Sequence, residues 1–211
     1  MTNQKYKLLI LDYGGVYSFD YTSAYFSKIL SDAFGKSPNE EERRKIIEKS
    51  HTFGEGKLTT SQYISSVTKL LEVPDFPTVE KFEGITISVT NPPSDTMKKL
   101  VKNVRKAGIK VSLLSDMYMF EIKKTRPTGR YKGFDYTAFS AESGMTNRNS
   151  DFFKQTLGYF NIAAEDALFV DDGKANIEVA QSIGLNTLYV DKQIFNSAEQ
   201  LAQRIREILQ G

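Results

Sequence analysis

From about residue 94 onward, short apolar runs alternate with amphipathic segments, and no other feature of the sequence constrains the fold as strongly. Apolar runs at 109–114, 134–139, 167–170 and 186–190 predict strands, while the segments 94–107, 151–160, 174–183 and 197–209 predict helices. Strands that alternate with helices form a mostly parallel sheet covered on both faces. With a further apolar run at 7–11, the pattern predicts an α/β fold with a doubly wound, Rossmann-like parallel sheet.

Residues 18–90 interrupt this alternation soon after the first predicted strand. From about Thr22 to Leu71 the apolar residues recur every three or four positions, as in YFSKILSDAF and YISSVTKLLEV, and Asn39 is placed to cap a helix. Prolines punctuate the exit from this region. We therefore expect a helical cap at 18–90, inserted between core segments 1–17 and 91–211. Such an insert lies over the carboxyl ends of the strands and can act as a lid.

Composition excludes several classes of function. The net charge is only +2, with basic and acidic residues interleaved, so we expect no nucleic-acid partner. We expect no membrane partner either, because no apolar run approaches spanning length. The chain has no cysteine and one histidine, which excludes thiolate catalysis, cysteine-zinc sites and histidine clusters. We expect a cytoplasmic protein that is a monomer or a homodimer.

Polar residues follow three of the predicted strands. Asp12 follows the first apolar run, Ser115 follows IKVSLL, and Asp171 and Asp172 follow ALFV. The carboxyl ends of parallel strands share one edge of the sheet, so these side chains are expected to converge. Carboxylates and phosphate oxygens are ligands that Mg²⁺ prefers, so the pattern predicts a magnesium and phosphate site.

The first strand end has the features of a nucleophile site. An unprotonated aspartate such as Asp12 can attack phosphorus, and the backbone N–H groups of Gly14 and Gly15 can cradle phosphate oxygens. Taken singly, the residues have simpler interpretations. Asp12 can be a turn residue, Ser115 a turn or cap residue, and Asp171 a helix N-cap.

Three segments carry a resemblance to a known family. LLILDYGGVY, VSLLSD and ALFVDDGKANIEVAQSIGLNTL resemble the first, second and fourth motifs of the haloacid dehalogenase-like (HAD) hydrolases, in the same order and with a cap after the first motif. FGEGKLTTSQY is similar to a cap segment in the sub-branch of sugar-phosphate phosphatases and the amino-terminal domain of soluble epoxide hydrolases. The resemblance covers nearly the whole chain.

The resemblance implies a role for each matching residue. Asp12 would be the nucleophile and a magnesium ligand, and Ser115 would hydrogen-bond the phosphoryl oxygen. Asp171 would bind magnesium directly, and Asp172 directly or through water. Gly14 would offer its backbone carbonyl to the metal. The substrate-binding residues would be Gly14, Gly15, Ser115, Asp116 and Asn147.

The sequence departs from the family pattern at three positions. Gly14 stands where the phosphatases usually have a second aspartate, which acts as general acid and base. Asn147 stands at the lysine of the third motif, and the neighbouring Arg148 is the candidate to supply the missing catalytic charge. Asp116 is acidic where the branch usually has asparagine. Loss of one preorganised charge in such a site typically costs ~10²–10³ in rate.

These observations lead to three hypotheses. The first is a magnesium-dependent phosphatase of a small phosphorylated metabolite, acting through an aspartyl-phosphate on Asp12. The second is a weak or inactive relative that serves as a phosphate- or metal-binding module, which the substitutions at Gly14 and Asn147 favour. The third, dehalogenation of a 2-haloacid, ranks last because paired acids such as Asp171 and Asp172 suit a metal better.

Overall fold

A five-stranded, all-parallel sheet forms the centre of the molecule. The computed structural model describes residues 5–21, 23–90 and 92–211. The strands are β1 (Leu8–Leu11), β2 (Lys110–Ser115), β3 (Tyr136–Phe139), β4 (Ala167–Asp171) and β5 (Asn186–Tyr189), in the order β3-β2-β1-β4-β5. In the register, Leu11 of β1 pairs with Leu113 on one side and Val170 on the other. The ends of β1, β2 and β4 therefore lie side by side.

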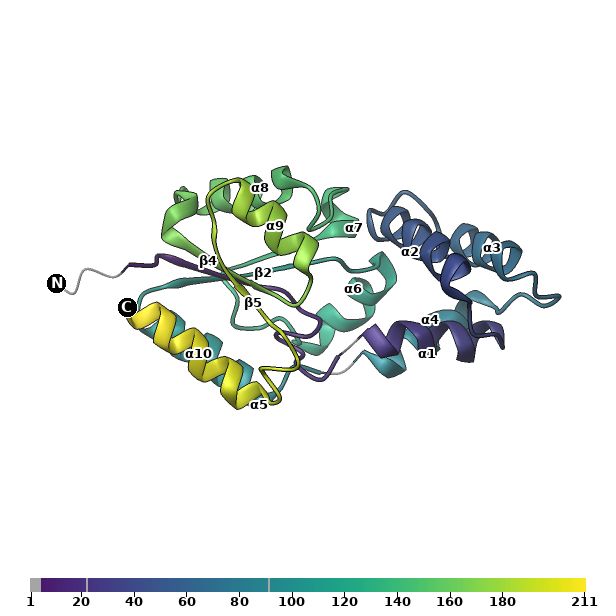
Figure 1. Cartoon of the computed structure of the whole chain (residues 1–211), viewed down its shortest axis with the longest axis horizontal. Helices are drawn as coiled ribbons and strands as arrows, with labels where there is room; N and C mark the ends of the chain where they lie inside the picture. Colours follow the sequence, from purple (N-terminus) through teal and green to yellow (C-terminus); the bar gives the residue numbers. More distant parts are fainter. Residues whose placement is uncertain (1–4, 22, 91) are drawn as a thin grey trace.

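Helices cover both faces of the sheet (Figure 1). Helices α5 (Asp95–Lys106) and α10 (Ala198–Gln210) pack on one face, and α8 (Ser150–Phe160) and α9 (Lys174–Ser182) on the other. Alternate side chains of β1 face the two helical layers. Leu9 and Leu11 join the apolar cluster that includes α5 and α10, while Leu8 and Ile10 join the cluster of α8 and α9. The predicted α/β class and doubly wound parallel sheet are confirmed.

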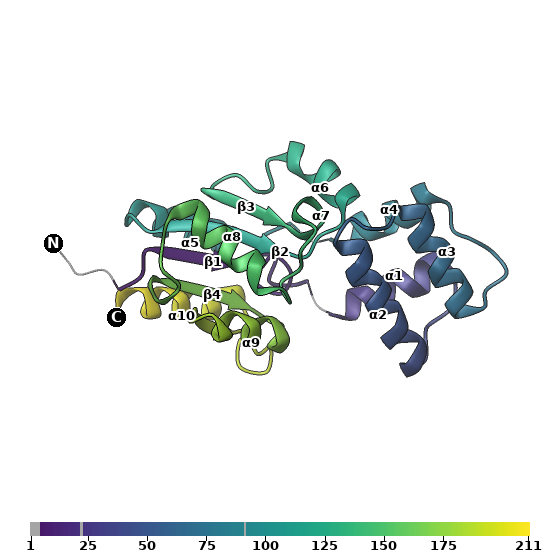
Figure 2. The same ribbon diagram turned by 90° about the horizontal axis from the view of Figure 1, so that it is seen from above.

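A separate group of helices stands beyond the carboxyl ends of the strands (Figure 2). It consists of α1 (Ser23–Phe34), α2 (Glu40–Gly54), α3 (Thr60–Leu71) and α4 (Val79–Val89). The group has its own apolar cluster, to which Ile46, Val67 and Phe82 contribute, and Phe120 reaches it from the core. Within the described residues, no helix combines the length and the apolar character that are needed to cross a membrane.

Most of the predicted elements occur within one or two residues of the expected bounds. Ser94 caps α5, and Asn39 forms a capping box at the start of α2, as expected. Helix α4 was missed, because Pro74 and Pro77 indicated the end of the helical region. The short elements α6 (Met119–Thr125), α7 (Ser140–Ser143), η1 (Arg126–Thr128) and η2 (Ala164–Asp166) were also missed. The expected bounds at residues 1, 22 and 91 lie outside the described residues.

Candidate active site

Three carboxylates meet at the carboxyl edge of the sheet. Asp12 follows β1, Asp171 ends β4, and Asp172 follows it. Each offers one oxygen, and these three oxygens all lie within 4.8 Å of one another. The backbone fixes this arrangement, because the Asp12 N–H donates to the Val170 carbonyl across 3.0 Å. The structure thus brings together residues that are about 160 positions apart in the chain, and the group could hold a metal ion.

Burial raises the pKa of all three carboxyls, and neighbouring carboxylates add to the rise at Asp12 and Asp171. Burial raises the pKa of Asp12 well above its ordinary value, and the nearby charges of Asp171 and Asp172 raise it further. Burial also raises the pKa of Asp171 to about 7. Their shared negative charge is unfavourable without a cation, since a buried carboxylate needs a charge partner. This electrostatic frustration makes the group a candidate for cation binding.

Asp171 is held by an array of N–H donors. The Gly173 backbone N–H donates to Asp171 Oδ1 across 2.6 Å. The Asn176 amide donates to Oδ1 and Oδ2 at 3.2 and 3.1 Å, and the Asn147 amide donates to Oδ2 at 3.3 Å. These bonds lower the pKa of the carboxyl in opposition to its burial. Asn176 was not singled out from the sequence, although its place in the first turn of α9 was available as a signal.

The turn after β1 places two glycines close to the carboxylates. Gly15 has a φ of +69°, and a Cβ at this position would lie 2.1 Å from Asp172 Oδ2. A Cβ at Gly14 would lie 3.0 Å from Cδ1 of Tyr21. The Tyr21 ring therefore covers the position from which the family's second aspartate would project. Gly14 lines the cavity described below, whereas Gly15 gives the side chain of Asp172 its room.

Lys192 fastens the same turn from the segment after β5. Its ammonium donates to the carbonyls of Gly15 and Phe19 across 2.6 and 2.7 Å, and lies 3.3 Å from the centroid of the Phe19 ring. Burial lowers the pKa of this lysine, and the negative charge of Asp172 partly opposes that shift. The Lys192 ammonium is thus engaged in hydrogen bonds to the backbone of the turn. It was not identified from the sequence.

The end of β2 contributes one hydroxyl and one further acid. The Ser115 hydroxyl hydrogen-bonds to Asp12 and lowers the pKa of that carboxyl. Asp116 accepts from the Asn147 backbone N–H at 2.9 Å, and the surrounding protein raises its pKa to about 6. Ser115 is buried, while Asp116 reaches solvent through the cavity. Both predicted positions therefore lie beside the carboxylate group.

Asn147 and Arg148 point to different environments. Asn147 is 1% exposed, and its Oδ1 is buried with no hydrogen-bond partner among the described residues. This oxygen is an acceptor available to a ligand. Arg148 is exposed and lines an outer groove, not the cavity that contains Asp12. The backbone turns here, with the Asn149 N–H donating to Thr146 across 2.9 Å, so consecutive side chains face opposite ways. The guanidinium of Arg148 therefore does not stand where the family's lysine would.

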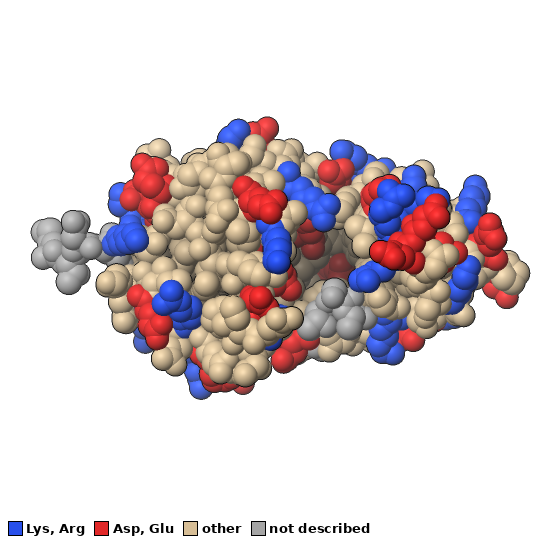
Figure 3. Space-filling view, viewed as in Figure 1, with Lys and Arg blue, Asp and Glu red and all other residues tan. Residues whose placement is uncertain are grey.

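A cavity of about 400 Å³ joins the carboxylates to the helical group. Its core side contains the three carboxylates, Ser115 and Asn147, and its other wall includes Phe26, Arg43, Ile47 and His51. Figure 3 shows the hollow between the two parts of the molecule, with acidic side chains inside it and basic side chains around its rim. His51, expected to pack or lie at the surface of the cap, is half-buried and lines this cavity.

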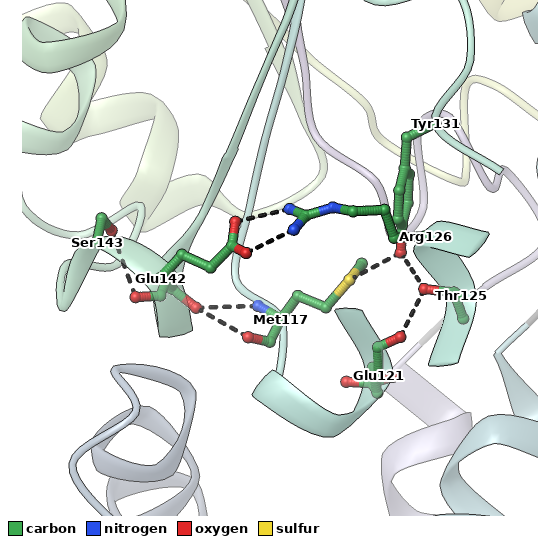
Figure 4. A network of polar contacts seen from close by, with 8 residues as sticks. Met117, Glu121, Thr125, Arg126, Tyr131, Glu142 and Ser143 are labelled. Carbon is green, nitrogen blue, oxygen red and sulfur yellow. Dashed lines mark hydrogen bonds and ion pairs between the residues drawn. The ribbon is translucent and has the colours of Figure 1, made fainter. Parts of the chain in front are cut away.

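Glu121 is a further acid of the cavity, and the sequence did not indicate it. It accepts from the Thr90 hydroxyl at 3.1 Å and from the Tyr118 N–H at 3.2 Å, and burial raises its pKa to about 7. A polar network holds this segment (Figure 4). Thr125 donates to the Glu121 carbonyl at 2.6 Å, and Arg126 forms a paired contact with Glu142, both distances being 2.7 Å. The network fixes α6 beside the end of β2.

The fold is that of several solved structures. An HAD family enzyme of Bacteroides thetaiotaomicron, in complex with magnesium and inorganic phosphate, superposes with a TM-score of 0.70 at 19% identity, over 88% of this chain and 94% of that one. A predicted HAD-like family hydrolase of Porphyromonas gingivalis gives a TM-score of 0.75 at 16% identity, over 96% and 98% of the two chains. The chain has the HAD-like fold. This confirms the fold that the three motifs implied.

Comparisons at the level of sequence identify fewer relatives than the comparison of folds. No family model matches the chain. A mouse protein, acyl-CoA dehydrogenase family member 10, is 22% identical over 143 residues, which are 66% of this chain. The matched part spans only 13% of the mouse protein.

Proposed function

We propose that this protein is a magnesium-dependent phosphatase that cleaves the phosphate monoester of a small metabolite through an aspartyl-phosphate on Asp12. The observation that carries the proposal is the meeting of Asp12, Asp171 and Asp172, with oxygens within 4.8 Å of one another, on the wall of the cavity. Magnesium and inorganic phosphate in the similarly folded Bacteroides enzyme support it.

The donor set fits a hard divalent cation. Asp12, Asp171 and Asp172 offer carboxylate oxygens, and Gly14 would add its backbone carbonyl. When bound, Mg²⁺ would supply positive charge that lowers the pKa of these carboxyls and offsets the charge of the phosphoryl group. Asp12 then remains unprotonated, as a nucleophile must be.

The covalent steps are carried by this chain's own residues. An Asp12 oxygen attacks phosphorus, a new P–O bond forms, and the bond from phosphorus to the leaving alcohol breaks. The Ser115 hydroxyl donates to a phosphoryl oxygen and holds it in line. Water then attacks the phosphorus of the aspartyl-phosphate, which releases inorganic phosphate and restores the Asp12 carboxylate.

Proton transfer to the leaving alcohol needs an acid, and Gly14 supplies none. Asp116 and Glu121 both line the cavity and have a pKa of about 6 and about 7, near the pH at which such an acid works. We assign to these two residues both the donation of a proton to the leaving alcohol and its recovery from the water that attacks the aspartyl-phosphate. Because Asn147 brings no charge to the phosphoryl group, the enzyme is expected to be ~10²–10³ slower than one that has the lysine.

A second candidate is a binding module with the same fold and no turnover. The neutral Asn147 and the outward-facing Arg148 favour it, because the site then lacks the cation that would stabilise the transition state. This candidate still predicts binding of a divalent cation, so metal binding alone does not separate the two. Dehalogenation of a 2-haloacid is disfavoured, since a carboxylate substrate would meet three acids without a cation.

Hydrolysis of p-nitrophenyl phosphate separates the two candidates. The rate is measured with Mg²⁺ and with a chelator, for the wild type, for Asp171→Asn, and for Asp151→Asn, an exposed acid on α8 that serves as the control. The phosphatase proposal expects turnover only with Mg²⁺, lost in Asp171→Asn and kept in the control. Absence of turnover, while Mg²⁺ still raises the melting temperature, supports the binding module.

A further inference from the structure

The far wall of the cavity carries basic residues on one face of α2. Arg43, Ile47 and His51 are spaced by four residues, which places them on the same side of the helix, and all three line the cavity. The same three residues line the outer groove, so the cavity continues into this groove at α2. Arg43 therefore stands where the cavity opens.

Helix α2 runs from the core to this opening. At its end, the Gly54 carbonyl accepts from the Ser140 hydroxyl of the core across 2.6 Å. Arg43 lies eleven residues earlier, which corresponds to about 16 Å along the helix axis. The opening is thus well separated from the contact of α2 with the core. A substrate with its phosphate at the carboxylates would extend under α2 toward Arg43.

Two arginines at the opening have no ion pair within the described part of the chain. The acids of the outer groove that flank them are mostly engaged elsewhere: Glu41 pairs with Lys45 at 2.6 Å and Glu48 with Arg44 at 3.5 Å. Glu40, in the first turn of α2, is the remaining acid of the groove. No such pair holds Arg43, and Arg148 is also unpaired across the groove.

The core approaches α2 at His51, close to the end of the helix that contacts Ser140. The positive charge of Arg148, which belongs to the core, adds to burial in lowering the pKa of His51 on α2. Arg148 and His51 are therefore neighbours, and Arg43 lines the same groove. The cavity thus has acids at one end, where a metal and a phosphate would compensate them, and the guanidinium group of Arg43 at the other, with Arg148 in the adjoining groove.

From this distribution of charge we infer that the substrate is a phosphate monoester with a second anionic group, a carboxylate or another phosphate, at the end remote from the scissile bond. Arg43, together with Arg148, binds that second group. This inference rests on the proposed function for the orientation of the substrate. It gives Arg148 the role of a specificity residue at the entrance.

A matched pair of ligands tests the inference. 6-Phosphogluconate and sorbitol 6-phosphate have the same carbon chain and differ only in a carboxylate or an alcohol at the far end. Their dissociation constants are measured by calorimetry with Mg²⁺, and their KM where they are hydrolysed. Because a hydrogen bond to a charged group adds substantially to binding, the wild type should prefer the carboxylate by about 10-fold or more.

Variants assign the preference to the entrance. Arg43→Ala should lose most of the preference and Arg43→Ala with Arg148→Ala all of it, with sorbitol 6-phosphate changed by less than about twofold. Arg43→Lys should restore part of the preference. Lys49→Ala removes an equal charge from an exposed position of α2 that lines neither the cavity nor the groove, and it should change nothing. Circular dichroism verifies that each variant is folded.

The outcomes separate this inference from the proposed function. If the carboxylate ligand binds with the expected preference but is not hydrolysed, the entrance is as inferred and the phosphatase proposal fails. If p-nitrophenyl phosphate is hydrolysed but the two ligands bind equally, the phosphatase proposal stands and the inference is overturned. Binding of neither ligand, or a preference that survives in the double variant, also overturns it.

Discussion

Replacing Asn147 by lysine tests whether the carboxylate group lacks a positive charge. The Asn147 amide lies 3.3 Å from Asp171 Oδ2 and faces the cavity, so the longer side chain has room to bring its ammonium to the carboxylates. In the metal-free wild type, the pKa of Asp171 is raised from 3.8 to about 7 by burial. As pH rises between these values, the unfolded chain loses this proton before the folded chain does, so folding becomes less favourable.

The size of the effect follows from the charges. An ammonium about 4 Å from a carboxylate gains about 4 kcal/mol at an effective dielectric constant of about 20. Removing the lysine from water takes back roughly half of this gain. Asn147→Lys should therefore raise the free energy of unfolding at pH 8 by about 2 kcal/mol relative to the wild type. At pH 5, where Asp171 holds its proton in the folded state, this gain should be absent.

Urea unfolding with a chelator at pH 5 and pH 8 measures this difference. Asn147→Met is the control, because methionine has a similar length and no charge. Because it also removes the amide donor that lowers the pKa of Asp171, it should destabilise the protein more at pH 8 than at pH 5, opposite in sign to the lysine. If Asn147→Lys shifts stability equally at pH 5 and pH 8, the carboxylates do not carry the unbalanced charge that their raised pKa implies.

Three further predictions concern the same site. Gly15→Ala should lower the free energy of unfolding by about 1–2 kcal/mol, because alanine is strained at this positive φ, and should displace Asp172. Mg²⁺ should therefore raise the melting temperature of this variant less than that of the wild type, and an unchanged urea midpoint and Mg²⁺ response would contradict this. In scanning fluorimetry of the wild type, Mg²⁺ should stabilise the protein more at pH 8 than at pH 5, because protons compete for Asp12 and Asp171, whose pKa is raised; equal shifts would argue against these ligands. Glu121→Gln should slow the hydrolysis of alkyl phosphates by about 10²-fold and that of p-nitrophenyl phosphate far less, because nitrophenolate leaves without a proton. Equal losses of rate for the two kinds of substrate would exclude proton donation by Glu121.

The sequence predicted the parts of the site that follow directly from strand order. Asp12, Ser115 and Asp171 each end or follow a buried strand, and parallel strands bring such residues to one edge whatever the intervening chain does. The fold class could be predicted for the same reason, because the alternation of strands and helices after residue 94 is regular. Local rules sufficed for the caps at Asn39 and Ser94.

The residues that were missed depend on how helices pack, which has no local signal. Arg43 looks like any other charged residue of an exposed helix until α2 is placed over the sheet. Glu121 fits a capping box of α6, and only the tertiary structure shows that it faces the same cavity as Asp12. Arg148 lines the outer groove and not the cavity of Asp12, because adjacent residues of a turn point in different directions.

The most direct test of the central claim is the rate of p-nitrophenyl phosphate hydrolysis by Asp12→Asn in the presence of Mg²⁺. The amide is close in size to the carboxylate and cannot act as the nucleophile. We predict that the rate falls by at least about a thousandfold, while circular dichroism shows an intact fold. Hydrolysis that continues in Asp12→Asn at a rate near that of the wild type would contradict the account, because the phosphoryl group would then not pass through Asp12.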